Sequence, residues 1–248
     1  MIEVIYVMWL RQLKRYWRSK ARLLGSLGQP ILFLIAFGFG FGPTFQKAGG
    51  GNYIQFLAPG IIAMSTLFTA MFTGIEVVWD RRFGFLKETL VAPVARFQIM
   101  LGKTFGGASV AVIQGTIVFL LTLMVGFRPS ITLVPLAFVF LFLIALFFTS
   151  MGIAIASKIE DMHAFPLIMN FLIMPLFFLS GALFPLNGLP KAIEVVVKLN
   201  PLSYGVDGLR SSLTGMTGFN MVTDIVVLTV LSIIMNIIGS LLFSKIEL

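Results

Sequence analysis

The sequence predicts an all-α membrane protein with six transmembrane helices. Of its 248 residues, 58% are hydrophobic and only 11% are Asp, Glu, Lys or Arg, whereas soluble domains carry about 25% charged residues. Six stretches of 19 to 24 residues contain no charge at all, and a membrane-spanning helix needs about 20 apolar residues. None of these stretches alternates polar and apolar residues as the strands of a membrane barrel do. This composition excludes a soluble enzyme, a disordered chain and a fibrous repeat.

The predicted spans divide the rest of the chain into two sets of connecting segments. The spans are 24–42, 54–75, 104–126, 133–156, 164–184 and 225–243. The set formed by 1–23, 76–103, 157–163 and 244–248 holds 13 Lys and Arg, and the other set holds 5. Basic residues accumulate on the cytoplasmic side, so we expect both termini in the cytoplasm. The net charge of +8 therefore indicates orientation rather than nucleic-acid binding.

Residues 2–22 form a predicted amphipathic helix. One face carries Ile2, Ile5, Tyr6, Trp9, Leu13, Tyr16 and Trp17, and the other carries Arg11, Lys14, Arg15, Arg18 and Arg22. Aromatic residues opposite a basic stripe are typical of a helix that lies in the headgroup plane. The alternative is a plain cytoplasmic lead-in to the first span. The long basic region is unlike that of a cleavable signal peptide.

The loop 76–103 is the largest on the predicted cytoplasmic side. Phe83, Leu86 and Leu90 recur at the spacing of one helix face, and Pro93 should end that helix. A short, charged and partly apolar helix beneath the membrane is suited to docking a cytoplasmic partner. The alternative is a solvated connection between two spans.

The segment 185–224 is the largest piece on the predicted outer side. Pro190 and the Asn200-Pro201 pair can begin and end a short helix. We expect one or two short helices here that dip back into the outer leaflet and cap the bundle. Asp207 and Arg210 are three residues apart and are expected to form a surface ion pair across one helical turn.

The six predicted spans have only uncharged side chains. They contain no ionisable residue, which argues against ion coupling, and the amides of Gln55, Gln114, Asn170 and Asn236 either join helices or line a lumen. Gly102-Lys103-Thr104 is not a phosphate-binding loop, because that motif requires a glycine at the position of Phe97. No Cys and a single His exclude a disulfide framework and a multi-His metal site.

Four stretches together resemble the ABC-2 type permease family, the membrane subunits of ABC exporters. They are FLAPGII (56–62), the loop sequences WDRRFGFLKE (79–88) and LVAPVAR (90–96), LSGALFP (179–185) and NPLSYGVDGLR (200–210). The loop is the most specific of the four. The resemblance is strongest to the permeases of daunorubicin-type drug resistance and nodulation-factor export.

This resemblance implies a role for each segment of a single transmembrane domain covering 1–248. Residues 2–22 are similar to the family's connecting helix, 185–222 to its re-entrant outer helices, and the helix around 80–92 to its coupling helix, which docks on a separate ATPase. The implied coupling residues are Asp80, Arg81, Arg82, Phe83, Leu86, Lys87 and Glu88, and the outer gate candidates are Phe184, Pro185 and Tyr204. Arg82→Glu combined with Leu86→Asp is expected to uncouple ATP hydrolysis from export.

The implied function is that of a permease subunit of an ATP-driven exporter in the plasma membrane. It would move a hydrophobic or amphipathic substrate (a drug, lipid or lipid-linked glycan) out of the cytoplasm or inner leaflet. Two ATPase subunits would bind ATP and Mg, a second permease copy or paralogue would complete the pore, and this chain itself would be no enzyme, hold no cofactor and bind no nucleic acid. The alternatives are an intramembrane lipid-modifying enzyme, which needs a buried nucleophile or acid–base pair, and a passive pore, which needs no ATPase.

Overall fold

The computed structural model describes residues 2–47, 51–91, 93–186 and 190–246. Within these ranges every regular element is a helix. The helices are α1 (Ile2–Arg18), α2 (Lys20–Gly40), α3 (Gly42–Lys47), α4 (Tyr53–Phe72), α5 (Ile75–Arg82), α6 (Phe85–Val91), α7 (Arg96–Met124), the 3-10 turn η1 (Ile131–Leu133), α8 (Val134–Ala156), α9 (Ala164–Phe178), α10 (Lys191–Leu199), α11 (Pro201–Thr214) and α12 (Met221–Ser244). The side chains of Arg22 and Leu90, which belong to two predicted faces, lie outside what is described.

Five segments of the described chain are long and apolar enough to cross a membrane. They are Leu23–Gly40, Tyr53–Arg82, Arg96–Met124, Ile131–Ala156 and Met221–Ser244. The predicted span 164–184 is instead the 15-residue helix α9, which rises about 22 Å at 1.5 Å per residue, short of the ~30 Å hydrocarbon core. The protein is therefore a multi-helix membrane protein, and the count of six spans stays a prediction.

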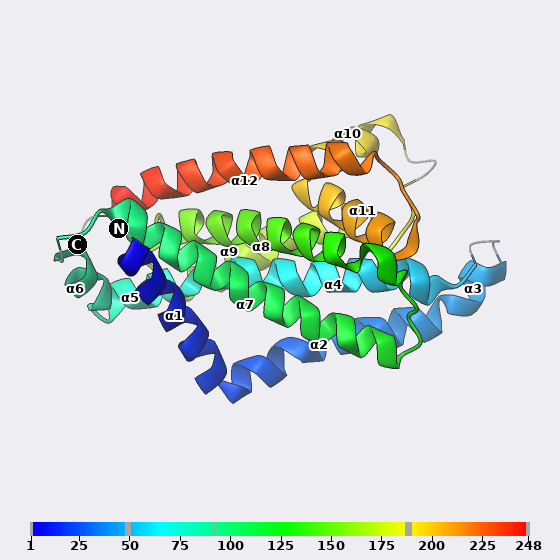
Figure 1. Cartoon of the computed structure of the whole chain (residues 1–248), viewed down its shortest axis with the longest axis horizontal. Helices are drawn as coiled ribbons and strands as arrows, with labels where there is room; N and C mark the ends of the chain where they lie inside the picture. The colour runs from blue at the N-terminus through cyan, green and yellow to red at the C-terminus, as the bar shows by residue number, and fades with distance from the viewer. Residues whose placement is uncertain (1, 48–50, 92, 187–189, 247–248) are drawn as a thin grey trace.

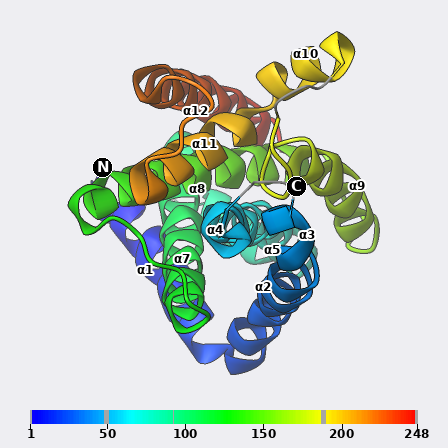
Figure 2. The same ribbon diagram turned by 90° about the vertical axis from the view of Figure 1, so that its right-hand side faces the viewer.

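Helix α4 occupies the middle of the bundle, packed against α2, α7, α8, α9 and α11 (Figure 2). Two glycines permit the closest approaches. A Cβ at Gly60 would collide with the backbone of Ala182, and one at Gly152 would collide with the backbone of Met71. Small residues at helix contacts let backbones approach closely within a membrane. The Pro59-Gly60 step thus places α4 directly against the turn that follows α9.

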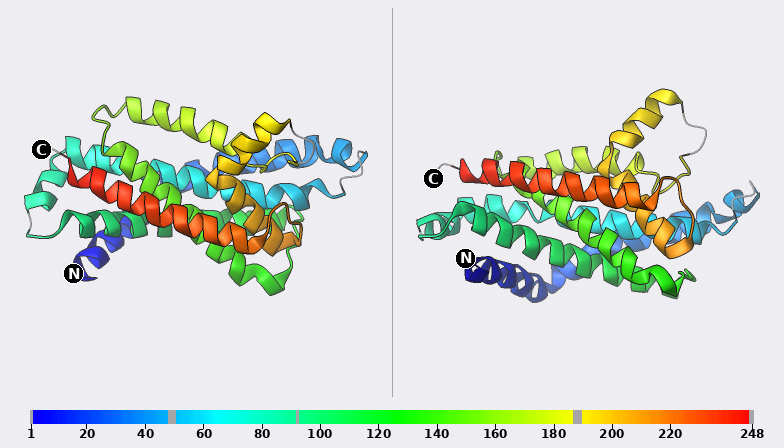
Figure 3. Two further views of the ribbon diagram at one scale, coloured as in Figure 1. Left: turned by 90° about the horizontal axis from the view of Figure 1, so that it is seen from above. Right: turned by 45° about the horizontal axis from the view of Figure 1, so that its top comes forward.

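The predicted grouping of segments matches the two ends of the molecule (Figures 1 and 3). Both chain ends lie at one end, where the Arg96 side chain donates to the carbonyl oxygens of Ser244 and Ile246. At the other end the Tyr53 hydroxyl donates to the Leu183 carbonyl oxygen at 2.9 Å. The end that holds both termini is the one with the basic excess. Which side of the membrane it faces stays a prediction.

The outer segment contains two helices, as expected. Asn200 ends α10 and begins α11, and its side-chain oxygen accepts from the backbone N–H of Leu202 at 3.0 Å. Its amide nitrogen donates to the Leu176 carbonyl oxygen at 2.7 Å, which ties this corner to α9. Helix α11 packs into the bundle against α4, α8 and α12, whereas α10 projects from it (Figure 2). The position of α10 and α11 in the outer leaflet stays a prediction.

Candidate functional site

The predicted coupling segment is two helices rather than one. Helix α5 ends at Arg82, and α6 begins at Phe85 after Gly84, whose φ of +80° is a left-handed conformation that favours glycine. The single continuous helix expected around 80–92 is therefore wrong. So is the shared apolar face, because Phe83 is 76% exposed while Leu86 is fully buried. We call α5 and α6 together the α5–α6 arm.

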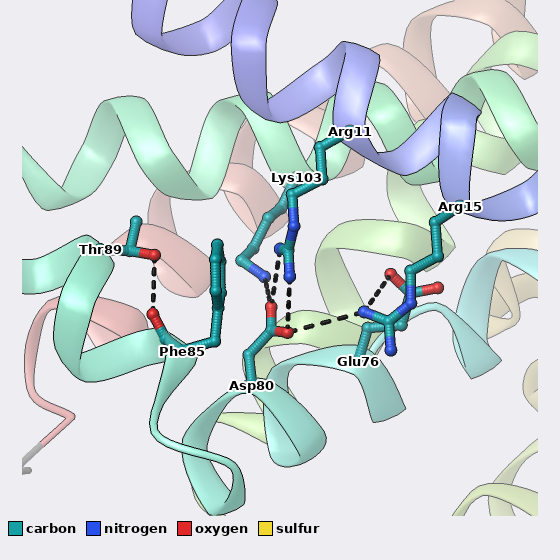
Figure 4. A network of polar contacts seen from close by, with 7 residues as sticks. All are labelled: Arg11, Arg15, Glu76, Asp80, Phe85, Thr89 and Lys103. Atoms are coloured by element: carbon teal, nitrogen blue, oxygen red, sulfur yellow. Dashed lines mark hydrogen bonds and ion pairs between the residues drawn. The ribbon is translucent and has the colours of Figure 1, made fainter.

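Asp80 is the centre of a buried ionic network at the end that holds both termini (Figure 4). The guanidinium of Arg11 donates to both of its carboxylate oxygens, at 3.0 and 3.1 Å. The Lys103 ammonium also binds this carboxylate. Asp80 is 4% exposed and Lys103 is fully buried. A charge this deep is tolerated only when it is paired, so these contacts fix α1, the α5–α6 arm and α7 to one another.

Arg15 and aromatic rings extend this network along α1. The Arg15 guanidinium lies 3.7 Å from the Glu76 carboxylate and 3.6 Å from that of Asp80. The Arg11 guanidinium also lies over the Phe85 ring, 3.7 Å from its centroid, a cation–π geometry. Two residues of the predicted basic stripe, Arg11 and Arg15, thus reach carboxylates of the α5–α6 arm.

Helix α1 packs along α7, and two glycines make this possible. A Cβ at Gly102 would lie 2.6 Å from the Met8 Cβ, and one at Gly106 would lie 2.7 Å from the Gln12 Cβ. The Tyr16 hydroxyl donates to the Gln114 amide oxygen at 2.6 Å. The buried face of α1 is thus Met8, Gln12 and Tyr16. Part of the predicted aromatic face belongs to the protein interior, and the headgroup position of α1 stays a prediction.

Helices α7 and α12 and the candidate span Tyr53–Arg82 extend beyond the charge-free stretches and carry ionisable residues. Lys103, expected in a loop, lies inside α7, and Glu76 and Asp80 lie inside the candidate span Tyr53–Arg82. Asp224 is in the first turn of α12 and is fully buried. The description of neutral spans is therefore correct only for the stretches as drawn from the sequence.

The predicted coupling residues separate into a surface and an interior set. Arg82, Phe83, Lys87 and Glu88 are exposed at the tip of the arm. Asp80 and Leu86 are buried beneath that tip. Arg81 lies between the two sets and donates to the Glu160 carboxylate at 2.8 Å, which links the arm to the loop after α8. The arm thus has an exposed tip and a base anchored in the bundle.

Arg210 holds the opposite end of the bundle together. Its guanidinium donates to the Gly181 carbonyl oxygen at 2.8 Å and to the Phe56 carbonyl oxygen at 3.4 Å, and it lies 3.9 Å from the centroid of the Phe56 ring. The Asp207 carboxylate accepts from the backbone N–H groups of Gly218 and Phe219. Both side chains are buried, so the expected surface location of this pair is wrong.

Burial lowers the pKa of the Arg210 guanidinium to about 10, so the side chain is still protonated at neutral pH. The three contacts of this cation connect motifs that are far apart in the sequence: 56–62, 179–185 and 200–210. The residues that carry the family resemblance at this end are therefore in direct contact.

The three gate candidates do not form one site. Phe184 and Pro185 are exposed and line a small cleft beside α3 and Tyr53. Tyr204 is half-buried on α11, where it stacks on Phe219 at 5.2 Å and donates to the Lys198 carbonyl oxygen at 2.7 Å. A gating role for any of them stays a prediction.

A bundle of long apolar helices with an anchored polar arm at one end is typical of a multi-pass membrane protein. The chain belongs to the ABC-2 type transporter family, whose description matches residues 3–214. It is 30% identical to a transport permease named ycf38 from Cyanophora paradoxa, over 99% of this chain and 89% of that protein. It is 27% identical to nodulation protein J of Rhizobium leguminosarum bv. viciae, over 91% of this chain and 87% of that protein. The membership implies a partner ATPase.

The sequence did not predict the contacts that Lys103 and Arg11 make with Asp80 at the end that holds both termini. Lys103 was assigned to a loop and set aside as a false phosphate-binding motif, although it directly precedes an apolar stretch and follows a helix-contact glycine. Arg11 belongs to the predicted basic stripe of residues 2–22. Their common partner, Asp80, is among the predicted coupling residues, and no sequence pattern indicates that the three side chains meet.

Proposed function

We propose that this chain is the permease subunit of an ATP-driven exporter, energised by a separate ATPase that docks on the tip of the α5–α6 arm. The observation that carries the proposal is the construction of this arm. Its tip presents exposed Phe83, Lys87 and Glu88, while its base is fixed through Asp80 to Arg11 and Lys103. A surface that can bind a partner is thus rigidly connected to α1 and α7.

This connection suggests how movement passes into the membrane. When ATP binding brings two ATPase subunits together, each displaces the arm that it holds. Because Asp80 binds residues of α1 and α7 simultaneously, displacement of the arm moves both helices with it rather than bending a loop. Interfaces and packed cores switch between discrete arrangements rather than deforming continuously, so the shift would open a path between two permease copies.

The remaining parts of the proposal concern cargo, assembly and location. The passenger is hydrophobic or amphipathic, because the helices that would line a path are mostly apolar. Two ATPase subunits, with ATP and Mg, and a second permease copy or paralogue complete the complex. The chain lies in the plasma membrane with both termini cytoplasmic, since the end that holds them carries the excess of Lys and Arg.

The proposal is tested by reversing the polarity of the tip. Phe83→Asp should abolish co-purification with the partner ATPase and its stimulated ATP hydrolysis, while the permease remains inserted. Leu199→Asp is the matched control, because Leu199 is 77% exposed and Phe83 is 76% exposed, at opposite ends of the molecule. Leu86 is buried. In the double substitution Arg82→Glu with Leu86→Asp, the change at Leu86 would therefore test packing rather than docking.

Two results would contradict the proposal. If the Phe83→Asp variant binds the ATPase as the unmodified protein does, the α5–α6 arm is not the docking surface. Transport that continues without any ATPase would identify the protein as a passive pore.

A further inference from the structure

A cleft of about 420 Å³ enters the bundle between α2 and α4. Its walls are mainly apolar and include Gly25, Gln29 and Pro30 of α2, Ser65 and Phe68 of α4, and Trp79 of α5. The volume falls within the range of about 300–1,000 Å³ that is typical of ligand sites.

A basic groove of about 830 Å³ lies next to this cleft, between α1 and the α5–α6 arm. Trp79 lines both spaces. The groove contains Lys14, Arg15 and Arg18, and Arg15 is engaged by the Glu76 and Asp80 carboxylates. Lys14 and Arg18 are exposed, and neither pairs with a carboxylate in the described part of the chain. The groove therefore presents unneutralised positive charge next to an apolar cleft.

One polar group inside the cleft lacks a partner. The Ser65 hydroxyl is 3% exposed and makes no hydrogen bond within the described residues. Buried polar groups are nearly always hydrogen-bonded, and leaving one unpaired costs free energy. Together the two adjoining spaces form one site that offers cations, a buried hydroxyl donor and apolar walls.

We propose that this site binds an anionic phospholipid drawn from the membrane leaflet nearest the termini. The phosphate lies between Lys14 and Arg18, the ester region reaches the Ser65 hydroxyl, and an acyl chain fills the cleft between α2 and α4. A soluble acidic partner could cover the groove but could not occupy the apolar cleft. The inference goes beyond the proposed function and shares with it only the assignment of the cytoplasmic leaflet.

The experiment measures lipid binding to the full-length chain in detergent, with or without its ATPase, by native mass spectrometry. The probes are dioleoyl phosphatidylglycerol, dioleoyl phosphatidylcholine and glycerol 1-phosphate. We expect phosphatidylglycerol to bind in preference to phosphatidylcholine, and glycerol 1-phosphate to bind only weakly. Lys14→Gln with Arg18→Gln should weaken phosphatidylglycerol binding about thirtyfold, which corresponds to about 1 kcal/mol for each cation near the membrane surface.

The cleft is tested separately by filling it. Gly25→Phe should abolish binding of phosphatidylglycerol, whereas Gly28→Phe should not, because only Gly25 lines the cleft. A Cβ at either glycine meets nothing within 4 Å, so both variants should fold, and gel filtration checks this. Lys20→Gln with Lys158→Gln is the control for loss of two exposed charges.

Four outcomes would overturn the proposal. The first is equal binding of the two phospholipids. The second is equal binding by the Gly25→Phe and Gly28→Phe variants, and the third is an equal loss in both double Gln variants. Tight binding of glycerol 1-phosphate would equally contradict it, since the cleft would then contribute nothing. None of these results depends on ATP-driven transport, so this proposal and the proposed function can fail independently.

Discussion

Removing the Asp80 charge should cost far more stability than removing the Lys103 charge, although the two groups bind each other. The two substitutions leave different partners behind. Asp80→Asn leaves the Lys103 ammonium fully buried without its carboxylate. Lys103→Met leaves Asp80 with two hydrogen bonds from Arg11, at 3.0 and 3.1 Å, and the Arg11 side chain is 28% exposed to solvent.

The magnitudes follow from this difference. Removing one member of a buried pair costs about 3–5 kcal/mol, because the other charge is left uncompensated, and this applies to Asp80→Asn. For Lys103→Met the loss is one charged hydrogen bond, offset by no longer burying an ammonium, so we expect less than about 2 kcal/mol. The double variant should recover to within about 2 kcal/mol of the unmodified protein, because the charge that then lacks Asp80, the Arg11 guanidinium, is partly exposed to solvent rather than fully buried.

The assay is reversible unfolding of the purified permease in mixed micelles with increasing denaturing detergent, followed by circular dichroism. Glu160→Gln is the control, since Glu160 is 77% exposed and pairs with Arg81 at the surface, where ion pairs contribute about 0–1 kcal/mol. Equal destabilisation by Asp80→Asn and Lys103→Met would refute the reasoning. So would a double variant as unstable as the sum of the two single ones.

Two further predictions concern the other contacts. Gly106→Ala should destabilise the protein by about 1–3 kcal/mol through overpacking against Gln12. Gly40→Ala, with nothing within 4 Å of its Cβ, should stabilise it by up to about 1 kcal/mol. The same unfolding assay measures both, and a change in stability of the same sign in the two variants would contradict the prediction. Arg210→Met should cost about 1–3 kcal/mol by leaving the Gly181 carbonyl oxygen without its donor, while Arg128→Met at an exposed position should stay within about 0.5 kcal/mol. If the unfolding temperature of the Arg210 variant falls no further than that of the Arg128 control, Arg210 does not hold this end of the bundle together.

The coupling segment shows where prediction from sequence stopped. The spacing of Phe83 and Leu86 indicates one helix face, but Phe83 lies in the turn between α5 and α6, where Gly84 adopts a positive φ and breaks the helix. The proline-glycine motif at 59–60 was recognised as a pattern. Its reason, the close contact of Gly60 with the backbone of Ala182, depends on residues more than 120 positions apart in the chain.

The sequence by itself determined that the protein lies in a membrane, that its fold is all-α, and which connecting segments group at each of its two ends. These depend on composition and on runs of apolar residues, which a chain carries locally. Only the tertiary structure decided which charges are buried. Arg11 and Asp80 each lie in a locally charged segment that is typical of solvent exposure, and Lys103 directly precedes an apolar stretch. Their contact exists because glycines at 102 and 106 let α1 approach α7. Burial of charge is a property of that packing, and no local pattern records it.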